Sequence, residues 1–209
     1  PSKFDNILND ANDPMGVDVA DIDSVWLACN GAIYLTNKVY SPTAYISVSF
    51  PALINETMRI LYWGIEQLQY DVYLNSLNTY YSFFIPTNNS MLEYIDPVSY
   101  GKSKTQLYRF YYDKTKVNKE QRVWASIWNY DTETGMVLDS VGKTTDVNVI
   151  KNRLKDILET HIVIGNVEDG RTYYRTKGGT EIRVSNVAAG ANGMTVEGSY
   201  QINEGQPLP

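Results

Sequence analysis

The sequence predicts an α+β fold in which antiparallel strands pack against amphipathic helices, and three observations lead to this prediction. The run 80–85 is dominated by aromatic and apolar residues, as a strand buried on both faces would be. Segments 55–72 and 145–161 carry apolar residues at steps that place them on one face of a helix. Segments 107–112 and 122–130 are rich in Tyr and Trp, residues that favour strands.

Composition narrows the classes of protein. At 209 residues the chain can bury a substantial core, and 43% hydrophobic residues disfavour disorder. The net charge of -6 disfavours nucleic acid and anionic membrane surfaces as partners. The single cysteine, Cys29, can form neither an internal disulfide nor, alone, a structural zinc site. No apolar run approaches the roughly 20 residues that span a bilayer.

The N-terminal part predicts a loop followed by a hairpin. We interpret the chain, which begins at Pro1, as a piece of a longer protein. Asn30-Gly31 is a strong signal for a tight turn. After it Ile33 and Leu35 alternate with polar residues, which indicates a strand with one buried face. Segment 43–54 is expected to be a connector with some strand character.

Next comes a helix capped by Asn55, in which Gly64 favours a bend or a break. After the strand at 80–85, Pro86 removes a backbone donor and ends the ladder. Thr87 or Asn88 is expected to cap a short helix that Asp96-Pro97 ends. The inward residues of that short helix would be Met91, Leu92 and Ile95.

The second half predicts a block of antiparallel strands and then a helix. Thr145 or Asp146 is a suitable N-cap for this helix, which ends near His161. The predicted strands are 107–112, 122–130, 136–138, 162–164, 171–176, 180–185 and 194–197. The predicted centre of the core consists of Phe84, Ile85, Leu154, Leu158, Ile162 and Val163, with His161 buried among them.

Three segments carry a resemblance to a known family. Phe84-Ile85-Pro86-Thr87-Asn88 resembles the Phe-Ala-Pro-Thr-Asn/Asp motif of fasciclin-like domains. Segment 158–165, which contains His161, resembles the central Tyr/Asn-His segment of that family, with Thr at the Tyr/Asn position. Segment 30–42 resembles its closing motif, which begins with Asn30-Gly31, although Tyr and Asn replace the usual His and Asp. The three motifs together are specific for this family.

The resemblance implies both a fold and a function. The fold would be an antiparallel β-sandwich or wedge with several helices packed at one side. The function would be that of a non-catalytic adhesion or interaction module without a cofactor, usually present in tandem copies. Similar bacterial multi-domain lipoproteins imply an extracytoplasmic location, at the cell surface or attached to the outer membrane. The partner would then be a protein or a glycan at that surface.

The order of the motifs indicates a division of the chain. Because the closing motif comes first, we interpret 1–42 as the end of a preceding fasciclin-like domain, with its closing strand at 30–42. Residues 43–209 would be a second such domain that lacks its own closing strand. Segment 32–40 is then expected to fill that gap, either within one chain or between two chains as a strand-swapped homodimer.

No set of residues predicts a catalytic or metal site. His161, the only histidine, is more typical of a hydrogen-bonded core residue than of a catalyst. An enzyme would require a deep pocket that holds His161 beside a carboxylate. The acidic pairs Asp21/Asp23 and Glu168/Asp169 match no ion-binding loop, so we predict no metal.

The aromatic block offers an alternative function. In a strand, alternate side chains point outward, and exposed Trp and Tyr suit stacking against sugars. The ligand surface that this suggests contains Tyr108, Tyr112, Trp124 and Trp128. The alternative is therefore a glycan-binding module of a bacterial surface polysaccharide-utilisation system. An aromatic core with both faces covered would explain the same residues and is slightly favoured.

Overall fold

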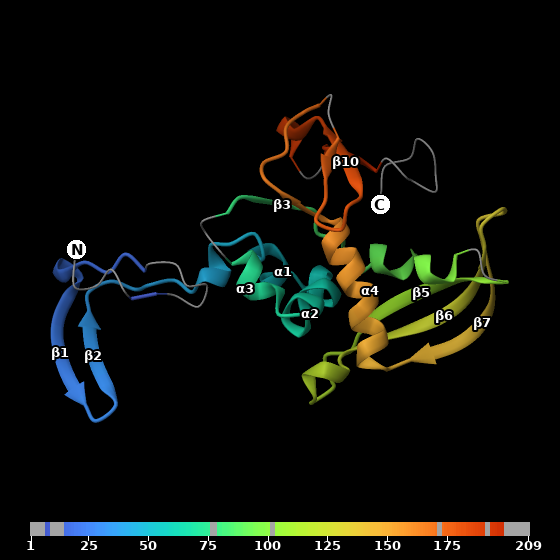
Figure 1. Cartoon of the computed structure of the whole chain (residues 1–209). Helices are drawn as coiled ribbons and strands as arrows, with labels where there is room; N and C mark the ends of the chain where they lie inside the picture. The colour runs from blue at the N-terminus through green and yellow to red at the C-terminus, as the bar shows by residue number, and fades with distance from the viewer. Residues whose placement is uncertain are drawn as a thin grey trace.

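The computed structural model describes residues 7–8, 15–75, 79–100, 103–170, 173–190 and 193–198. Helices and antiparallel strands both contribute, so the predicted α+β class is confirmed. In the described residues the strands form separate sheets rather than one continuous sheet (Figure 1). The prediction that 43–209 lacks its own closing strand concerns the end of the chain. Residues 199–209 lie outside the described residues.

The largest sheet is the antiparallel block that the Tyr- and Trp-rich segments predict. Its order is β4 (Tyr94–Ile95), β5 (Thr105–Tyr112), β6 (Val123–Asp131) and β7 (Met136–Thr144). Neighbouring strands are antiparallel, and Phe110 lies opposite Ala125 in the register. Almost every residue of the edge strand β7 is exposed, and its pairing with β6 is interrupted by two register shifts. Such irregularities make an edge a poor template for further strands.

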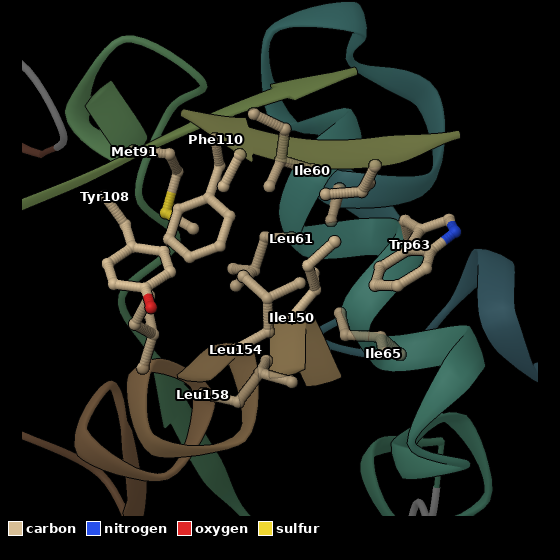
Figure 2. Packing of buried hydrophobic residues seen from close by; sticks show 14 of the residues in the cluster. Ile60, Leu61, Trp63, Ile65, Met91, Tyr108, Phe110, Ile150, Leu154 and Leu158 are labelled. Carbon is tan, nitrogen blue, oxygen red and sulfur yellow. The ribbon is translucent and has the colours of Figure 1, made fainter. Parts of the chain in front are cut away.

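Two helices cover one face of this sheet. α2 (Arg59–Gln67) contacts β5, α4 (Val147–Thr160) contacts β6, and the two helices contact each other. Asp146 caps α4 as predicted, because its side chain accepts from the N–H groups of Asn148 and Val149. In Figure 2 side chains from α2, α4 and β5 converge on a single hydrophobic cluster, and Leu154, Leu158 and Ile162 belong to it as predicted.

The helical segment before the central strand differs from the prediction. Segment 50–54 forms α1 (Phe50–Ile54) instead of having strand character. The helix predicted over 55–72 breaks at Gln69, which adopts a left-handed conformation with φ of 57°, and α3 (Tyr70–Leu74) follows. Gly64 remains helical and faces Leu154, and a Cβ there would lie 3.4 Å from the Leu154 side chain, an ordinary contact distance.

Strand β3 (Tyr81–Phe83) pairs with β8 (Ile162–Ile164) to form a second sheet. Phe83 and Ile85 pack against the core cluster, but Phe84 is only partly buried and does not belong to it. The prediction that Phe84 lies at the centre of the core is therefore wrong. Successive side chains of an extended segment alternate between its faces, and only one face of this segment meets the helices.

A third sheet lies at the C-terminal end of the described chain. Its order is β11 (Thr195–Gly198), β10 (Glu181–Ser185) and β9 (Tyr174–Arg175). The turn after β9 attaches it to the end of α4, because Gly178 donates to the Glu159 carbonyl at 2.7 Å. A Cβ on Gly178 would lie 3.1 Å from the Glu159 backbone, which is tight, so this contact favours glycine. The remaining elements are 3-10 helices at Val19–Asp21, Thr43–Tyr45, Glu56–Met58, Ser90–Leu92, Pro97–Ser99, Lys119–Gln121 and Val187–Ala189.

The fourth sheet is the predicted hairpin of β1 (Ile22–Ala28) and β2 (Gly31–Thr36). It stands apart from the helices and from the other sheets, at the left of Figure 1. Within the described residues β1 and β2 pair only with each other, so the expectation that 32–40 fills a gap in the same chain is wrong. Neither face is buried: Ile33 and Leu35 are exposed, contrary to the predicted half-buried strand.

Candidate functional site

Two of the three motif segments lie side by side in the structure. The backbone N–H of Phe84 donates to the His161 carbonyl at 3.0 Å, next to the pairing of β3 with β8. Segments 84–88 and 158–165 are thus structural neighbours although they are far apart in sequence. The third motif lies at the end of the separate hairpin, but its turn consists of Cys29 and Asn30, one residue earlier than predicted, because Gly31 of β2 already pairs with Ala28.

Asn88 has a structural role in the first motif. Its Oδ1 accepts from the Ile60 N–H at 3.1 Å, and its Nδ2 donates to the Glu56 carbonyl at 3.0 Å. Its own N–H donates to the Thr57 carbonyl. The side chain therefore satisfies backbone groups at the start of α2 and fixes the motif to that helix.

The region after Pro86 differs in part from the prediction. The strand ends before Pro86 as expected, and the Thr87 carbonyl accepts from the Met91 N–H at 3.2 Å. The Thr87 hydroxyl contacts the Ser90 hydroxyl at 3.3 Å rather than a backbone N–H. The predicted helix through Ile95 is wrong: one 3-10 turn is followed directly by β4. Pairing with β5 supplies the backbone partners that a helix would otherwise provide.

His161 has the geometry of a residue that closes a helix. Its Nδ1 lies 2.7 Å from the Ile157 carbonyl, and because a carbonyl only accepts, Nδ1 donates. Burial lowers the pKa of His161, while the bond to Ile157 raises it in part. No described carboxylate influences this pKa. The side chain is partly rather than fully enclosed, so the prediction of a buried His161 holds only in part.

The four aromatic residues of the predicted ligand surface do not lie together. Tyr108 is 4% exposed and belongs to the core cluster, so its assignment to a ligand surface is wrong. Tyr112 is partly buried and packs against the same cluster. Trp124 and Trp128 are partly exposed and alternate with Val123 and Ala125, which are buried. The helices cover one face of the sheet, and the two tryptophans lie on the other.

The outer face of the sheet is defined here by Arg109, Tyr111, Trp124 and Trp128. The rings of Tyr111 and Trp124 stack with centroids 4.5 Å apart. Arg109 lies over the Trp128 ring at 5.2 Å. The Trp128 Nε1 donates to the Ser126 hydroxyl at 2.9 Å. These contacts hold planar side chains in fixed orientations on a face that no described helix covers.

The hairpin β1–β2 exposes large apolar side chains on both of its faces. Trp26 lies opposite Ile33 on one face, and Val25 lies opposite Tyr34 on the other. Leu27 is 87% exposed. A two-stranded hairpin with two apolar faces is marginal in water by itself, so this surface is suited to contact another molecule.

The base of the hairpin is more polar and is organised by Asp21. The Tyr40 hydroxyl donates to the Asp21 carboxylate at 3.0 Å, and the Lys38 ammonium lies 3.6 Å away. The Asp18 N–H donates to the same carboxylate, and together with Tyr40 and Lys38 it lowers the pKa of Asp21. These bonds connect Asp21, just before β1, with Lys38 and Tyr40, just after β2.

A pocket of about 260 Å³ lies between α2 and the connection from β5 to β6. Sequence reasoning did not find it, because its walls come from segments far apart in the chain. The lining residues relevant here are Arg59, Tyr62, Glu66, Tyr112, Lys119 and Arg122. Its charged lining residues are two arginines, a lysine and a glutamate, so cations outnumber anions in the pocket although the chain has a net charge of -6.

Among the described residues, no group of His, Cys, Asp or Glu could hold a metal ion. No helix of this part of the chain is long and apolar enough to cross a membrane. No protein-family model matches the chain, and neither curated proteins nor solved structures show significant similarity to it.

Proposed function

We propose that this protein is a non-catalytic interaction module of the fasciclin-like type that acts in adhesion at the cell surface, outside the cytoplasm. The observation that carries the proposal is the separate hairpin with apolar side chains on both faces. The pairing of the two motif segments through β3 and β8 supports the assignment to a fasciclin-like wedge. Residues 1–42 then belong to a preceding unit of a tandem, and 43–209 form the next unit.

The hairpin can bind by adding a strand to an open sheet edge. β3 pairs only with β8, so none of the described strands occupies its other edge. The outer edge of the large sheet is less suitable, because the register shifts disrupt β7. We therefore assign β3 as the edge that accepts a hairpin.

The proposed occupant of this edge is the hairpin of a second copy. Each copy carries both an exposed hairpin and a β3 edge that no described strand occupies. The hairpin of each copy can therefore pair with the β3 edge of the other, which gives two identical contacts. This arrangement is a closed strand-swapped homodimer. It removes the exposed apolar surface of both hairpins from water, which is the favourable term in such an association.

Charged substitutions at the hairpin test this proposal. We expect the wild-type chain to sediment as a dimer, and Trp26→Asp or Ile33→Asp to give monomers, because a carboxylate cannot enter an apolar interface without a partner. Analytical ultracentrifugation over a hundredfold range of concentration measures the state. Val117→Asp is the control, since Val117 is an exposed apolar residue that lies outside the hairpin. A wild-type monomer throughout, or dimers of both hairpin variants, would contradict the swap.

A second candidate function is glycan binding at the outer face of the large sheet. It is favoured by Trp124 and Trp128, whose rings are held by Tyr111 and Arg109 on a face without a helix. The module would then belong to a bacterial surface polysaccharide-utilisation system.

Alanine substitutions on the outer face test the second candidate. Each of Trp124→Ala and Trp128→Ala is expected to reduce binding on a glycan array at least tenfold, because stacking area is lost while the core face is untouched. Tyr45→Ala, which removes an exposed aromatic ring that is not part of the sheet, should leave the array signal unchanged. An array on which wild type and both Trp variants give the same signal argues against this function.

A further inference from the structure

The pocket beside α2 has two cations without an anionic partner. Within the described part of the chain, neither Lys119 nor Arg122 forms an ion pair. Arg59 differs, because its Nη2 contacts the Glu56 carboxylate at 3.0 Å. The positive charge at the mouth of the pocket is therefore only partly compensated, by Glu66 on its wall. The positive potential of the pocket would therefore attract an anionic group of a ligand.

The arginines are held in place by backbone carbonyls. Arg122 Nε donates to the Lys116 carbonyl at 3.0 Å, and its Nη1 lies 3.5 Å from the Tyr112 hydroxyl. Arg59 Nη1 donates to the Leu53 carbonyl at 3.0 Å. Arg122 Nη2 has no hydrogen-bond partner among the described residues, so it can donate to a ligand. A guanidinium fixed before binding loses less freedom when it binds, which favours affinity.

The floor of the pocket is rigid. Trp63 is buried, and its Nε1 donates to the Lys119 carbonyl at 2.7 Å. This bond ties the 3-10 helix at Lys119–Gln121 to α2, and with it the position of the Lys119 backbone. The bond therefore helps to fix the position of these two walls of the pocket.

The walls provide aromatic rings and hydrogen-bond acceptors beside the cations. Tyr62 and Tyr112 are both partly buried, and their rings line the pocket. Burial, and to a smaller extent the charge of Glu66, raises the pKa of Tyr62. The Glu66 carboxylate can accept hydrogen bonds from hydroxyl groups, and it would repel a small, highly charged anion such as sulfate.

We propose that this pocket binds one acidic sugar residue, with its carboxylate at Arg122 and Lys119 and its hydroxyls at Glu66. A sugar ring has apolar C–H faces suited to the Tyr rings, hydroxyls suited to Glu66, and, when it is a uronic acid, one carboxylate for the cations. At about 260 Å³ the pocket is smaller than sites for drug-sized ligands and suits a single ring. The site is separate from the hairpin and from the outer face, and its test does not depend on either.

Calorimetric titration of the full chain with sodium glucuronate tests the proposal. The wild type is expected to bind glucuronate, and to bind methyl glucoside, the neutral matched sugar, at least tenfold more weakly. Arg122→Gln and Lys119→Gln should each weaken glucuronate binding roughly tenfold or more, because each removes a charged hydrogen bond. Lys114→Gln is the control, since this exposed lysine lies in the same connection but does not line the pocket. Binding should also weaken as salt is raised.

Several results would overturn the proposal. These are no binding of glucuronate, equal binding of glucuronate and methyl glucoside, or competition by sulfate as strong as by glucuronate, which would indicate a general anion site. Equal affinities of Lys119→Gln and Lys114→Gln would also overturn it. Lys119 is exposed, so Lys119→Gln remains a valid test even if Arg122→Gln fails to fold. Thermal unfolding of each variant verifies that the fold is intact.

Discussion

Replacement of Arg153 by Met is expected to lower the free energy of unfolding by about 3–5 kcal/mol. Arg153 Nη2 lies 3.0 Å from Asp96 Oδ2, and the two side chains are only 17% and 2% exposed. Asp96 connects β4 to the following 3-10 helix, where its Oδ1 also accepts from the Val98 N–H. Without Arg153 a buried carboxylate would lose the one cationic partner that it has among the described residues. The Arg153 side chain also packs over the Tyr108 ring, at 4.7 Å, and that contact would be reduced.

Urea denaturation measures this loss, and an exposed ion pair serves as the control. Arg183 and Glu197 pair across β10 and β11, with side chains 39% and 37% exposed. Arg183→Ala should cost only about 0–1 kcal/mol, because water screens an exposed pair. The double variant Asp96→Asn with Arg153→Met should recover part of the stability that Arg153→Met loses. If Arg153→Met and Arg183→Ala cost the same, the pair with Asp96 does not stabilise the fold as described.

The second large effect is expected at Phe110, where Phe110→Ala should cost about 3–5 kcal/mol. This ring is 0% exposed and lies between the sheet and the two covering helices (Figure 2). Its removal would leave a cavity that Leu154 and Leu61 cannot close without moving. The same denaturation experiment measures the cost, from the midpoint and the slope of the transition.

Phe84→Ala is the informative comparison for Phe110→Ala. The apolar run 80–85 predicted that Phe84 is central, which would give the two substitutions similar costs. Because Phe84 is only partly buried in the structure, we expect Phe84→Ala to cost clearly less. Equal losses would favour the sequence-based position of Phe84 over the structural one.

Local signals in the sequence predicted individual elements well. Asp146 caps α4 because a carboxylate before a helix satisfies free N–H groups, and this requires no distant partner. The signal at Asn30-Gly31 correctly predicted a hairpin here for a similarly local reason, although the turn itself is Cys29-Asn30 and Gly31 begins β2. The strands around Phe110 were also predicted, because their residues favour extended structure wherever they pack.

Features that depend on distant partners were not predicted. Tyr108 and Trp124 occupy neighbouring aromatic strands, and the sequence does not tell which face of the sheet α4 covers. The hairpin β1–β2 is separate from the other sheets, and the residues of the hairpin themselves do not indicate whether other strands pair with it. The pocket at Arg122 is a stronger example, since Arg59 belongs to a helix more than fifty residues earlier. Local pattern predicts elements, but it does not predict which of them meet.

The pairing of β3 with β8 has a consequence for the order of folding. Tyr81 lies opposite Ile164, so the entire large sheet and α4 form a loop closed by this short ladder. Closing so long a loop is entropically costly before its interior is compact. The strands β5, β6 and β7 are neighbours in sequence and can pair early, whereas β3 joins β8 late. The β3 edge, which the proposed dimer would use, is therefore completed last, so in that proposal a newly made chain would bind a second copy only after its own interior is ordered.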